Sequence, residues 1–94
     1  MKLEFACKET AKLYQTGKTK VFQSIVKVAL RKLDMIEAAA TLNDLKAPPG
    51  NRLEALRGNR SGQHSIRINN QWRICFCWDE RTNTAAQIEI VDYH

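Results

Sequence analysis

Residues 63–78 read QHSIRINNQWRICFCW, and the expected fold can be built outward from them. Two runs in this stretch alternate apolar and polar side chains, which is typical of half-buried β-strands. The first run places Ile66 and Ile68 on one face, and the second places four large apolar side chains on one face: Trp72, Ile74, Phe76 and Trp78. Asparagine tolerates the backbone of tight turns, so residues 69–70 indicate the turn of a hairpin.

The length of this turn follows from the side chains that must share a face. A two-residue loop would pair Ile66 with Arg73 and mix the faces, whereas a three-residue loop at 69–71, or an equivalent bulge, pairs Ile66 with Ile74. The same register sets Arg67 opposite Arg73, and like charges directly opposite each other destabilise a sheet. We expect either an anion such as phosphate between the two guanidinium groups, or two solvated arginines that point apart.

Positive charge is unevenly distributed along the chain. The net charge is +5, all eight lysines lie within residues 1–46, and six of the seven arginines follow residue 50. Residues 50–73 contain five arginines and one glutamate, a local charge of +4. Arginines on strands and turns contact phosphate or carboxylate more often than lysines on helices do. The charge therefore favours a nucleic-acid or acidic-protein partner without choosing between them.

The composition is that of one globular domain, residues 1–94. No apolar run is long enough to span a bilayer, and the N-terminal residues lack the apolar core of a signal peptide, so we expect a cytoplasmic protein with no membrane partner. The cysteine count of three is odd, which argues against a secreted disulfide scaffold. Cys75 and Cys77 with the distant Cys7 do not have zinc spacing, and His64 points to the other face, so we predict no metal site and no cofactor.

The remaining helices and strands are predicted from the spacing of apolar residues and from residues that break secondary structure. Residues 7–15 and 19 to about 39 are predicted helices, the second with an apolar stripe of Phe22, Ile25, Val26, Ala29, Leu33 and Ile36. Residues 41–44 resemble a capping box for a further helical turn, residues 47–50 break the chain, and residues 1–5, 52–56 and 85–91 are predicted strands. The expected fold is α+β, a small, mostly antiparallel twisted sheet with two N-terminal helices packed on one face and an open, arginine-bearing second face.

Four stretches carry a resemblance to a known family: RLEALRG at 52–58, QHSIRIN at 63–69, QWRICF at 71–76 and IVDYH at 90–94. Together they resemble the HigB toxins, the plasmid-maintenance killer branch of the RelE-like ribonuclease superfamily, over nearly the whole chain. The resemblance implies a RelE-like fold and a type II toxin that cleaves mRNA, typically in the ribosomal A site. It also implies a helix-turn-helix (HigA-like) antitoxin as the partner, with DNA contacted only through that antitoxin.

The resemblance assigns roles near the C-terminus. His94 matches the family's catalytic histidine, Tyr93 and Asp92 match its neighbours, and Arg73 matches the arginine of a Trp-Arg motif. Continued strand alternation would put Asp92 and His94 on the core side with Ile90. We therefore expect the last strand to end near Val91 if His94 is to reach the arginine-bearing face.

Residues 54–67 contribute the other expected site residues. Arg57 matches a basic position that contacts RNA in the family, and we expect Arg60 and Arg67 to bind RNA with it. Some relatives carry a working histidine where this chain has Glu54, so a two-histidine mechanism is not available at those positions. Glu54 is a candidate general base, or it pairs with an arginine across the strands.

The implied reaction is metal-independent, because the 2′-hydroxyl of RNA attacks the adjacent phosphate. His94 would act as the acid with Asp92 orienting it, and the base would be Glu54 or Tyr93; Tyr93 could instead stack on a nucleobase. Arginines 57, 67 and 73 would stabilise negative charge on phosphorus. The alternative is a non-catalytic basic module that binds an antitoxin or nucleic acid.

Overall fold

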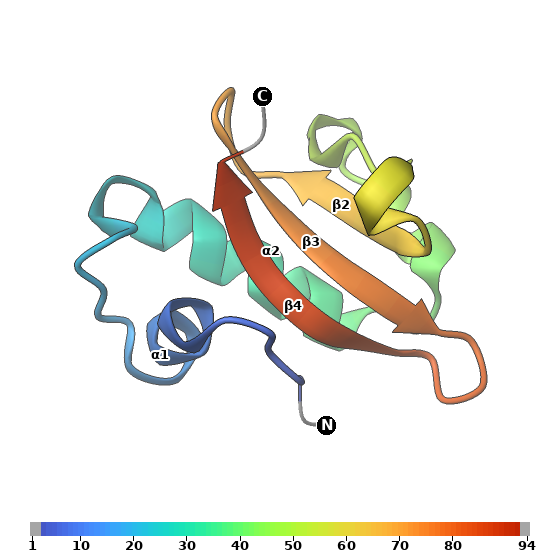
Figure 1. The fold of residues 1–94 in the computed structure, drawn as a ribbon, viewed down its shortest axis with the longest axis horizontal. Helices are drawn as coiled ribbons and strands as arrows, with labels where there is room; N and C mark the ends of the chain where they lie inside the picture. Colours follow the sequence, from blue (N-terminus) through green and yellow to red (C-terminus); the bar gives the residue numbers. More distant parts are fainter. Residues whose placement is uncertain (1–2, 93–94) are drawn as a thin grey trace.

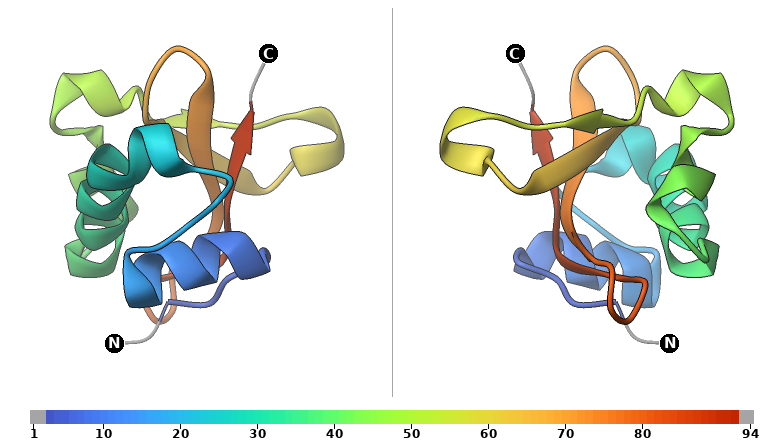
Figure 2. Two further views of the ribbon diagram at one scale, coloured as in Figure 1. Left: turned by 90° about the vertical axis from the view of Figure 1, so that its left-hand side faces the viewer. Right: turned by 90° about the vertical axis from the view of Figure 1, so that its right-hand side faces the viewer.

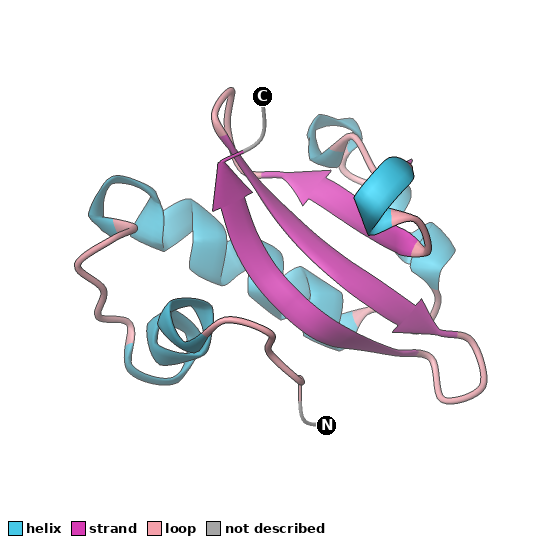
Figure 3. Cartoon of the chain, in the orientation of Figure 1, coloured by secondary structure: helices cyan, strands magenta, loops and turns pink. Residues whose placement is uncertain are grey.

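The computed structural model describes residues 3–92 (Figure 1). Two α-helices, α1 (Lys8–Thr16) and α2 (Val26–Ala38), precede four strands, β1 (Glu54–Ala55), β2 (Gln63–Arg67), β3 (Trp72–Asp79) and β4 (Thr84–Asp92). Short 3₁₀ helices lie between them: η1 (Gln23–Ile25), η2 (Leu42–Lys46), η3 (Pro49–Asn51) and η4 (Gly58–Arg60). The strands pair antiparallel in the order β1-β2-β3-β4, so the predicted α+β class is confirmed (Figure 3).

The central hairpin has the predicted register. Ile66 pairs with Ile74 and Arg67 with Arg73. The N–H of Asn69 and that of Ile68 both donate to the Trp72 carbonyl, at 3.2 and 2.9 Å. The side-chain oxygen of Asn69 accepts hydrogen bonds from the N–H groups of residues 71 and 72, each at 2.8 Å. An asparagine side chain thus satisfies the donors of the three-residue loop.

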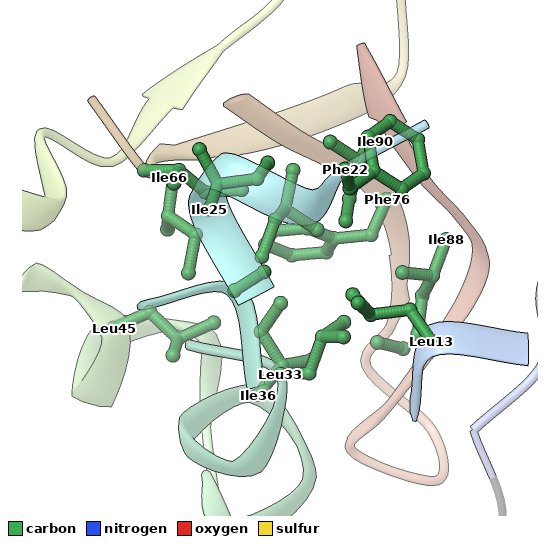
Figure 4. Packing of buried hydrophobic residues seen from close by; sticks show 14 of the residues in the cluster. Leu13, Phe22, Ile25, Leu33, Ile36, Leu45, Ile66, Phe76, Ile88 and Ile90 are labelled. Atoms are coloured by element: carbon green, nitrogen blue, oxygen red, sulfur yellow. The ribbon is translucent and has the colours of Figure 1, made fainter. Parts of the chain in front are cut away.

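The hydrophobic core lies between α2 and one face of the sheet. Figure 2 shows α2 on one side of the sheet and the segment containing η4 on the other. Figure 4 shows the packed cluster, in which helical side chains meet strand side chains: Leu13, Phe22, Ile25, Leu33, Ile36, Leu45, Ile66, Phe76, Ile88 and Ile90. Burial of each large apolar side chain contributes about 1.5–3 kcal/mol. The periodic stripe predicted for the second helix is therefore core packing.

The N-terminal segment covers the outer edge of β4. The Ile88 N–H donates to the Glu4 carbonyl and the Ile88 carbonyl accepts from the Ala6 N–H, both at 2.9 Å. The Ile90 N–H donates to Oγ1 of Thr10 in α1 at 3.1 Å, and Thr10 is fully buried. The predicted strand over residues 1–5 is reduced to a single parallel bridge between Phe5 and Ile88, and residues 1–2 lie outside the described part.

β4 contains a β-bulge that the alternation pattern did not predict. Cys75 pairs with Glu89, but two positions later Cys77 pairs with Ala86, so β4 has an extra residue here. Gln87 takes a left-handed backbone, with φ of 53°. The extra residue keeps Ala85 and Ile88 on the core side, where both are buried, although their spacing is odd.

Three element boundaries differ from the prediction. Thr19 does cap a turn, since its Oγ1 accepts from the Phe22 N–H at 3.1 Å, but the α-helix begins only at Val26, after η1. The strand predicted over residues 52–56 shortens to Glu54–Ala55, because Arg52 has a left-handed φ of 46°. β4 continues through Asp92 rather than ending near residue 91.

A buried polar group fixes the chain that leads into β1. Asn51 is fully buried, and its side-chain NH₂ donates to the carbonyls of Leu45 and Ala47, each at 3.2 Å. Its Oδ1 accepts a hydrogen bond from Nζ of Lys32 in α2. Burial, with Arg31 and Arg67 nearby, lowers the pKa of Lys32. Asn51 therefore links η2, the following loop and α2, and it sets the starting point of β1.

Candidate functional site

The face of the sheet opposite α2 carries one polar row across all four strands. The row consists of Glu54 in β1, Ser65 in β2, Cys75 in β3 and Glu89 in β4, each opposite the next. Ser65 and Cys75 are fully buried. The prediction of an open face is therefore wrong at its centre, because arginine side chains and residues 57–62 lie over it.

Arg73 reaches across β2 towards β1. Its Nε donates to Oγ of Ser65 at 2.7 Å, and its Nη2 donates to the Arg52 carbonyl at 2.7 Å. Nη2 lies 3.7 Å from Oε1 of Glu54, and the Arg73 side chain is only 11% exposed. The left-handed backbone of Arg52 allows this carbonyl to meet the guanidinium group. Arg73 and Glu54, both predicted site residues, are thus brought together.

Arg60 ties η4 to the far strand of the sheet. Its Nη1 donates to Oε1 of Glu89 at 2.6 Å and to Oε1 of Gln63 at 3.0 Å. The structure thus places the guanidinium of this predicted RNA-binding residue in an ion pair with Glu89. Beneath it, burial raises the pKa of the Cys75 thiol, with Glu89 adding to the shift and Arg60 opposing it. Cys75 is fully buried and its raised pKa favours the neutral thiol, so it serves as a packing residue.

The two arginines that pair across β2 and β3 point in different directions. Arg67 donates to Oδ1 of Asn70 in the turn, whereas Arg73 extends towards β1. The second of the two expectations for this pair, solvated arginines that point apart, fits in direction only, because the Arg73 side chain is 11% exposed and is not solvated. Arg57, directly before η4, is exposed.

The C-terminal end of β4 lies beside the same hairpin turn. Asp92 pairs with Trp72, and its Oδ2 accepts from Nε2 of Gln71 at 3.0 Å. This register puts Asp92 on the side of Trp72 and Ile90 and not on the arginine-bearing side, which corrects the expected end of the strand. The predicted residues Tyr93 and His94 lie outside the described residues.

Sequence reasoning missed the residues that hold Arg73 and Arg60. Ser65 and Glu89 looked like ordinary polar positions of alternating strands, and a backbone carbonyl such as that of Arg52 leaves no trace in a sequence. His64, which was predicted to face away from Cys75 and Cys77, pairs with Phe76, and the two rings stack with centroids 6.3 Å apart.

Two features are absent from residues 3–92. Nowhere in this range do three or more His, Cys, Asp or Glu side chains gather in a way that could hold a metal ion. None of the helices in the same range combines the length and apolar character needed to cross a bilayer.

The likeness to solved structures concerns the fold. The chain is similar to a chain of the heterotetrameric YoeB-YefM toxin-antitoxin complex from Staphylococcus aureus, with a TM-score of 0.60 and 22% identity, covering 100% of this chain and 97% of that one. A second YoeB-YefM complex from the same organism gives a TM-score of 0.55 at 21% identity, with the same coverage.

Sequence comparisons go further. The chain is 42% identical over 80 residues to Toxin HigB-1 of Vibrio cholerae serotype O1, covering 83% of this chain and 84% of the relative. It is 41% identical over 70 residues to an uncharacterized protein of Haemophilus influenzae, covering 72% and 69%. Residues 3–94 match the family described as the RelE-like toxin of type II toxin-antitoxin system HigB. The chain therefore belongs to the HigB family of RelE-like toxins of type II toxin–antitoxin systems.

Proposed function

We propose that this toxin is a metal-independent endoribonuclease that cleaves mRNA on the ribosome and is neutralised by a helix-turn-helix antitoxin. The observation that carries the proposal is the Arg73–Glu54 pair, 3.7 Å apart, on the sheet face that also bears Arg67. A carboxylate held by a fixed guanidinium group, with further positive charge nearby, suits proton transfer at a phosphodiester. Membership of a RelE-like toxin family supports RNA as the substrate.

The reaction balances without a cofactor. The 2′-oxygen forms a bond to the adjacent phosphorus, its proton passes to a base, and the bond from phosphorus to the 5′-oxygen breaks. The acid then protonates the leaving 5′-oxygen, which gives a 2′,3′-cyclic phosphate and a 5′-hydroxyl. We assign the acid to His94 and the base to Glu54, with Tyr93 as the other candidate base or a stacking partner for a nucleobase.

The arginines divide into two groups by their surroundings. Arg57 is exposed and Arg67 donates a hydrogen bond to Asn70 in the turn, so these two supply positive charge to RNA phosphates. Arg73 is a positioning residue, because its donors are engaged by Ser65 and Arg52 and its charge faces Glu54. Arg60 positions residues 57–62, and with them Arg57, through Glu89.

The competing function is a basic module that binds an antitoxin or nucleic acid without cleaving it. It is favoured by one observation: Arg60 and Arg73, two of the predicted site arginines, are engaged by carboxylates of the same chain. The two functions differ in their products, because only the endoribonuclease leaves new RNA ends.

The test is a single-turnover reaction of the purified toxin with mRNA loaded on ribosomes, with product ends mapped. We expect a 2′,3′-cyclic phosphate or 3′-phosphate end, and cleavage that persists in excess chelator once intact ribosomes have been verified. A Glu54→Gln variant should cut about 10²–10⁴-fold more slowly, the usual effect of losing one acid–base group. Intact mRNA with the folded wild-type protein would favour the binding module, and a 5′-phosphate product would overturn the metal-free scheme.

A further inference from the structure

Residues 57–62, here called the strap, lie across the arginine-bearing face of the sheet (Figure 2). Five of these six residues are exposed and none is buried. Inside the strap, the Arg60 N–H donates to the Arg57 carbonyl at 3.3 Å. The Ser61 N–H donates to the Gly58 carbonyl at 3.1 Å. A segment with so little buried surface opens at a low free energy, so the strap can move while the core stays intact.

The side chain of Arg60 attaches the strap to the sheet. Its Nη1 donates to Oε1 of Gln63 in β2 at 3.0 Å and to Oε1 of Glu89 in β4 at 2.6 Å. β3 lies between these two strands, and there Cys77 pairs with Gln63 and Cys75 pairs with Glu89. The guanidinium group therefore crosses β3 on the face that bears the Cys75 thiol, and Cys75 is fully buried beneath it.

The ion pair that holds the strap is partly open to solvent. The side chains of Arg60 and Glu89 are 34% and 27% exposed. An ion pair with this exposure contributes little to stability, because water and dissolved ions compete for both charges. A phosphate group accepts two N–H donors of a guanidinium group at once, as a carboxylate does. The phosphates of a bound RNA chain therefore compete directly with Glu89 for Arg60.

Two glycines with left-handed backbones lie at the ends of the strap. Gly58 has φ of 66° and Gly62 has φ of 92°, and a Cβ atom at either position would have open space around it. Close packing therefore does not require glycine here, whereas the backbone conformation favours it. Hinges of moving segments are a few such positions, which take up large changes in φ and ψ. The two glycines mark where the strap turns.

We propose that the RNA substrate releases the strap: a backbone phosphate takes Arg60 from Glu89, residues 58–62 turn away from β3, and Cys75 is uncovered. At rest Glu89 keeps Arg60 from RNA, and release converts Arg60 from a positioning residue into a phosphate ligand. Because RNA contacts Arg60 only in the open state, RNA binding shifts the strap towards that state. The source of the phosphate rests on the proposed function, whereas the opening of the strap does not.

Alkylation of Cys75 measures strap opening without a nuclease assay. The full chain is treated with iodoacetamide and mass spectrometry follows each cysteine separately, with Cys7, which precedes α1, as the internal standard. Glu89→Gln removes the charge of the carboxylate and keeps the shape of the side chain. Cys75 should then react about fivefold faster, the upper end for a partly exposed ion pair. Glu80→Gln, the same change in an exposed turn, should leave the rate unchanged.

A second variant separates opening from a change in thiol acidity. Loss of Glu89 lowers the pKa of the Cys75 thiol, which by itself would speed alkylation, whereas loss of Arg60 raises that pKa. Arg60→Gln should nevertheless speed alkylation of Cys75, because it also frees the strap. The two variants thus act in the same direction on opening and in opposite directions on the thiol.

Global unfolding also exposes Cys75, so urea distinguishes the two routes. Opening of the strap exposes little surface, and the alkylation rate should change little with urea below the unfolding transition. Amide exchange at Leu33, which lies in the core on α2, should be the same in both variants as in the wild type.

A thermodynamic cycle tests the exchange of partners. The probe is an oligonucleotide of 2′-O-methyl residues, which lacks the attacking hydroxyl and stays intact. Glu89→Gln should bind it about fivefold more tightly than the wild type does. Glu80→Gln makes the same change in net charge and should bind it nearly as the wild type does. In an Arg60→Gln background, Glu89→Gln should bring no gain, because the cation that it frees is absent.

The outcomes separate the strap from the proposed enzyme. Equal Cys75 alkylation in Glu89→Gln and Glu80→Gln, or slower alkylation in Arg60→Gln, would overturn the strap, whatever the nuclease assay gives. A gain in oligonucleotide affinity that persists in the Arg60→Gln background would overturn the exchange of partners. Faster alkylation and tighter oligonucleotide binding in Glu89→Gln, in a chain that cuts no RNA, would keep the strap and remove the enzyme.

Discussion

Arg67 and Arg73 are direct cross-strand partners, yet their surroundings differ. Arg67 contacts the turn through Asn70, whereas the Arg73 side chain is 11% exposed and bonded to Ser65 and Arg52. The two arginines therefore have different roles, although they occupy paired positions. Substitution should therefore give different phenotypes, one in RNA binding and the other in folding.

Replacing each arginine by alanine tests this division. Arg67→Ala should weaken RNA binding and reduce the salt dependence by about one phosphate contact, with stability unchanged. Arg73→Ala should lower the free energy of unfolding by about 1–3 kcal/mol, because it leaves buried acceptors unsatisfied. Salt titrations of RNA binding and urea unfolding measure the two effects. An equal loss of salt slope in both variants would contradict the positioning role of Arg73.

His94 is the residue whose loss should separate cleavage from binding. His94→Ala should reduce single-turnover cleavage by about 10²–10⁴, the usual share of one general acid. RNA affinity should stay within a few-fold, since the arginines supply the phosphate contacts. Cleavage is measured on ribosome-loaded mRNA, with circular dichroism as the folding control. A variant that cuts at the wild-type rate would exclude His94 from the mechanism.

The bulge in β4 shifts the alternation of side chains by one residue, so that the residues on both sides of it face the core. Gln87 adopts a left-handed backbone, which is unfavourable for a residue with a Cβ atom, and its side chain is exposed. Gln87→Gly should raise the free energy of unfolding by about 0.5–1 kcal/mol, because glycine adopts this conformation without strain. The neighbouring change Ala86→Gly is the control and should destabilise, since position 86 has no positive φ. Urea unfolding of both variants decides the point, and a destabilised Gln87→Gly would refute it.

The two α-helices are joined by a titratable contact. Tyr14 OH donates to Oε2 of Glu37 at 2.8 Å, and burial together with this bond raises the pKa of Tyr14 from 10.0 to about 12. The folded state holds the phenolic proton more tightly, so the contribution is complete below pH 10 and is lost as the pH rises towards 12. Tyr14→Phe should cost about 1 kcal/mol at neutral pH. The difference in unfolding free energy between the wild type and Tyr14→Phe, measured by denaturant titration, should disappear over pH 10–12. A difference that stays constant with pH would exclude the linkage. Glu37→Gln should weaken this pH dependence.

The alternation of side chains and the family resemblance predicted those elements in which apolar residues recur at a regular spacing. The hairpin register followed because only one loop length kept Ile66 and Ile74 on one face. The bulge at Gln87 was not predicted because it interrupts the alternation. β1 is shorter than predicted because hydrophobicity does not encode the left-handed backbone of Arg52. In the site, pairing with an arginine across the strands is one of the two roles that the sequence predicts for Glu54. The covering of Ser65 depends on side-chain directions, which the alternation of residues does not report.

Across the whole molecule, charge is sorted between two halves. The helical half contains all eight lysines, and the sheet half contains six of the seven arginines. Two of those arginines face carboxylates on the sheet, so the charge available to RNA is smaller than the sequence count suggests. Arg52 and Arg57, two cations of the sheet half, are exposed and do not belong to the buried row.

The whole protein is predicted to be toxic to the cell that expresses it. Expression of the chain alone should arrest growth, and co-expression of a cognate antitoxin should restore growth. The reason is membership of a type II toxin family. Colony counts and total-mRNA integrity are the measurements, with His94→Ala as the folded, non-toxic control. Harmless high-level expression of the folded wild-type chain would argue for the binding module.

The cover over β4 has a consequence for how the toxin is made. Among the described strands β4 is the last to be synthesised, yet Glu4, Ala6 and Thr10, which precede all four of these strands, form hydrogen bonds to it. Residues 4–10 therefore have no docking partner on the sheet until β4 has been synthesised, and such long-range closure slows folding. A nascent chain interrupted before β4 would leave Leu13 without its strand neighbours and would be open to proteases, so a cell that stalls during synthesis of this protein would release a degradable fragment.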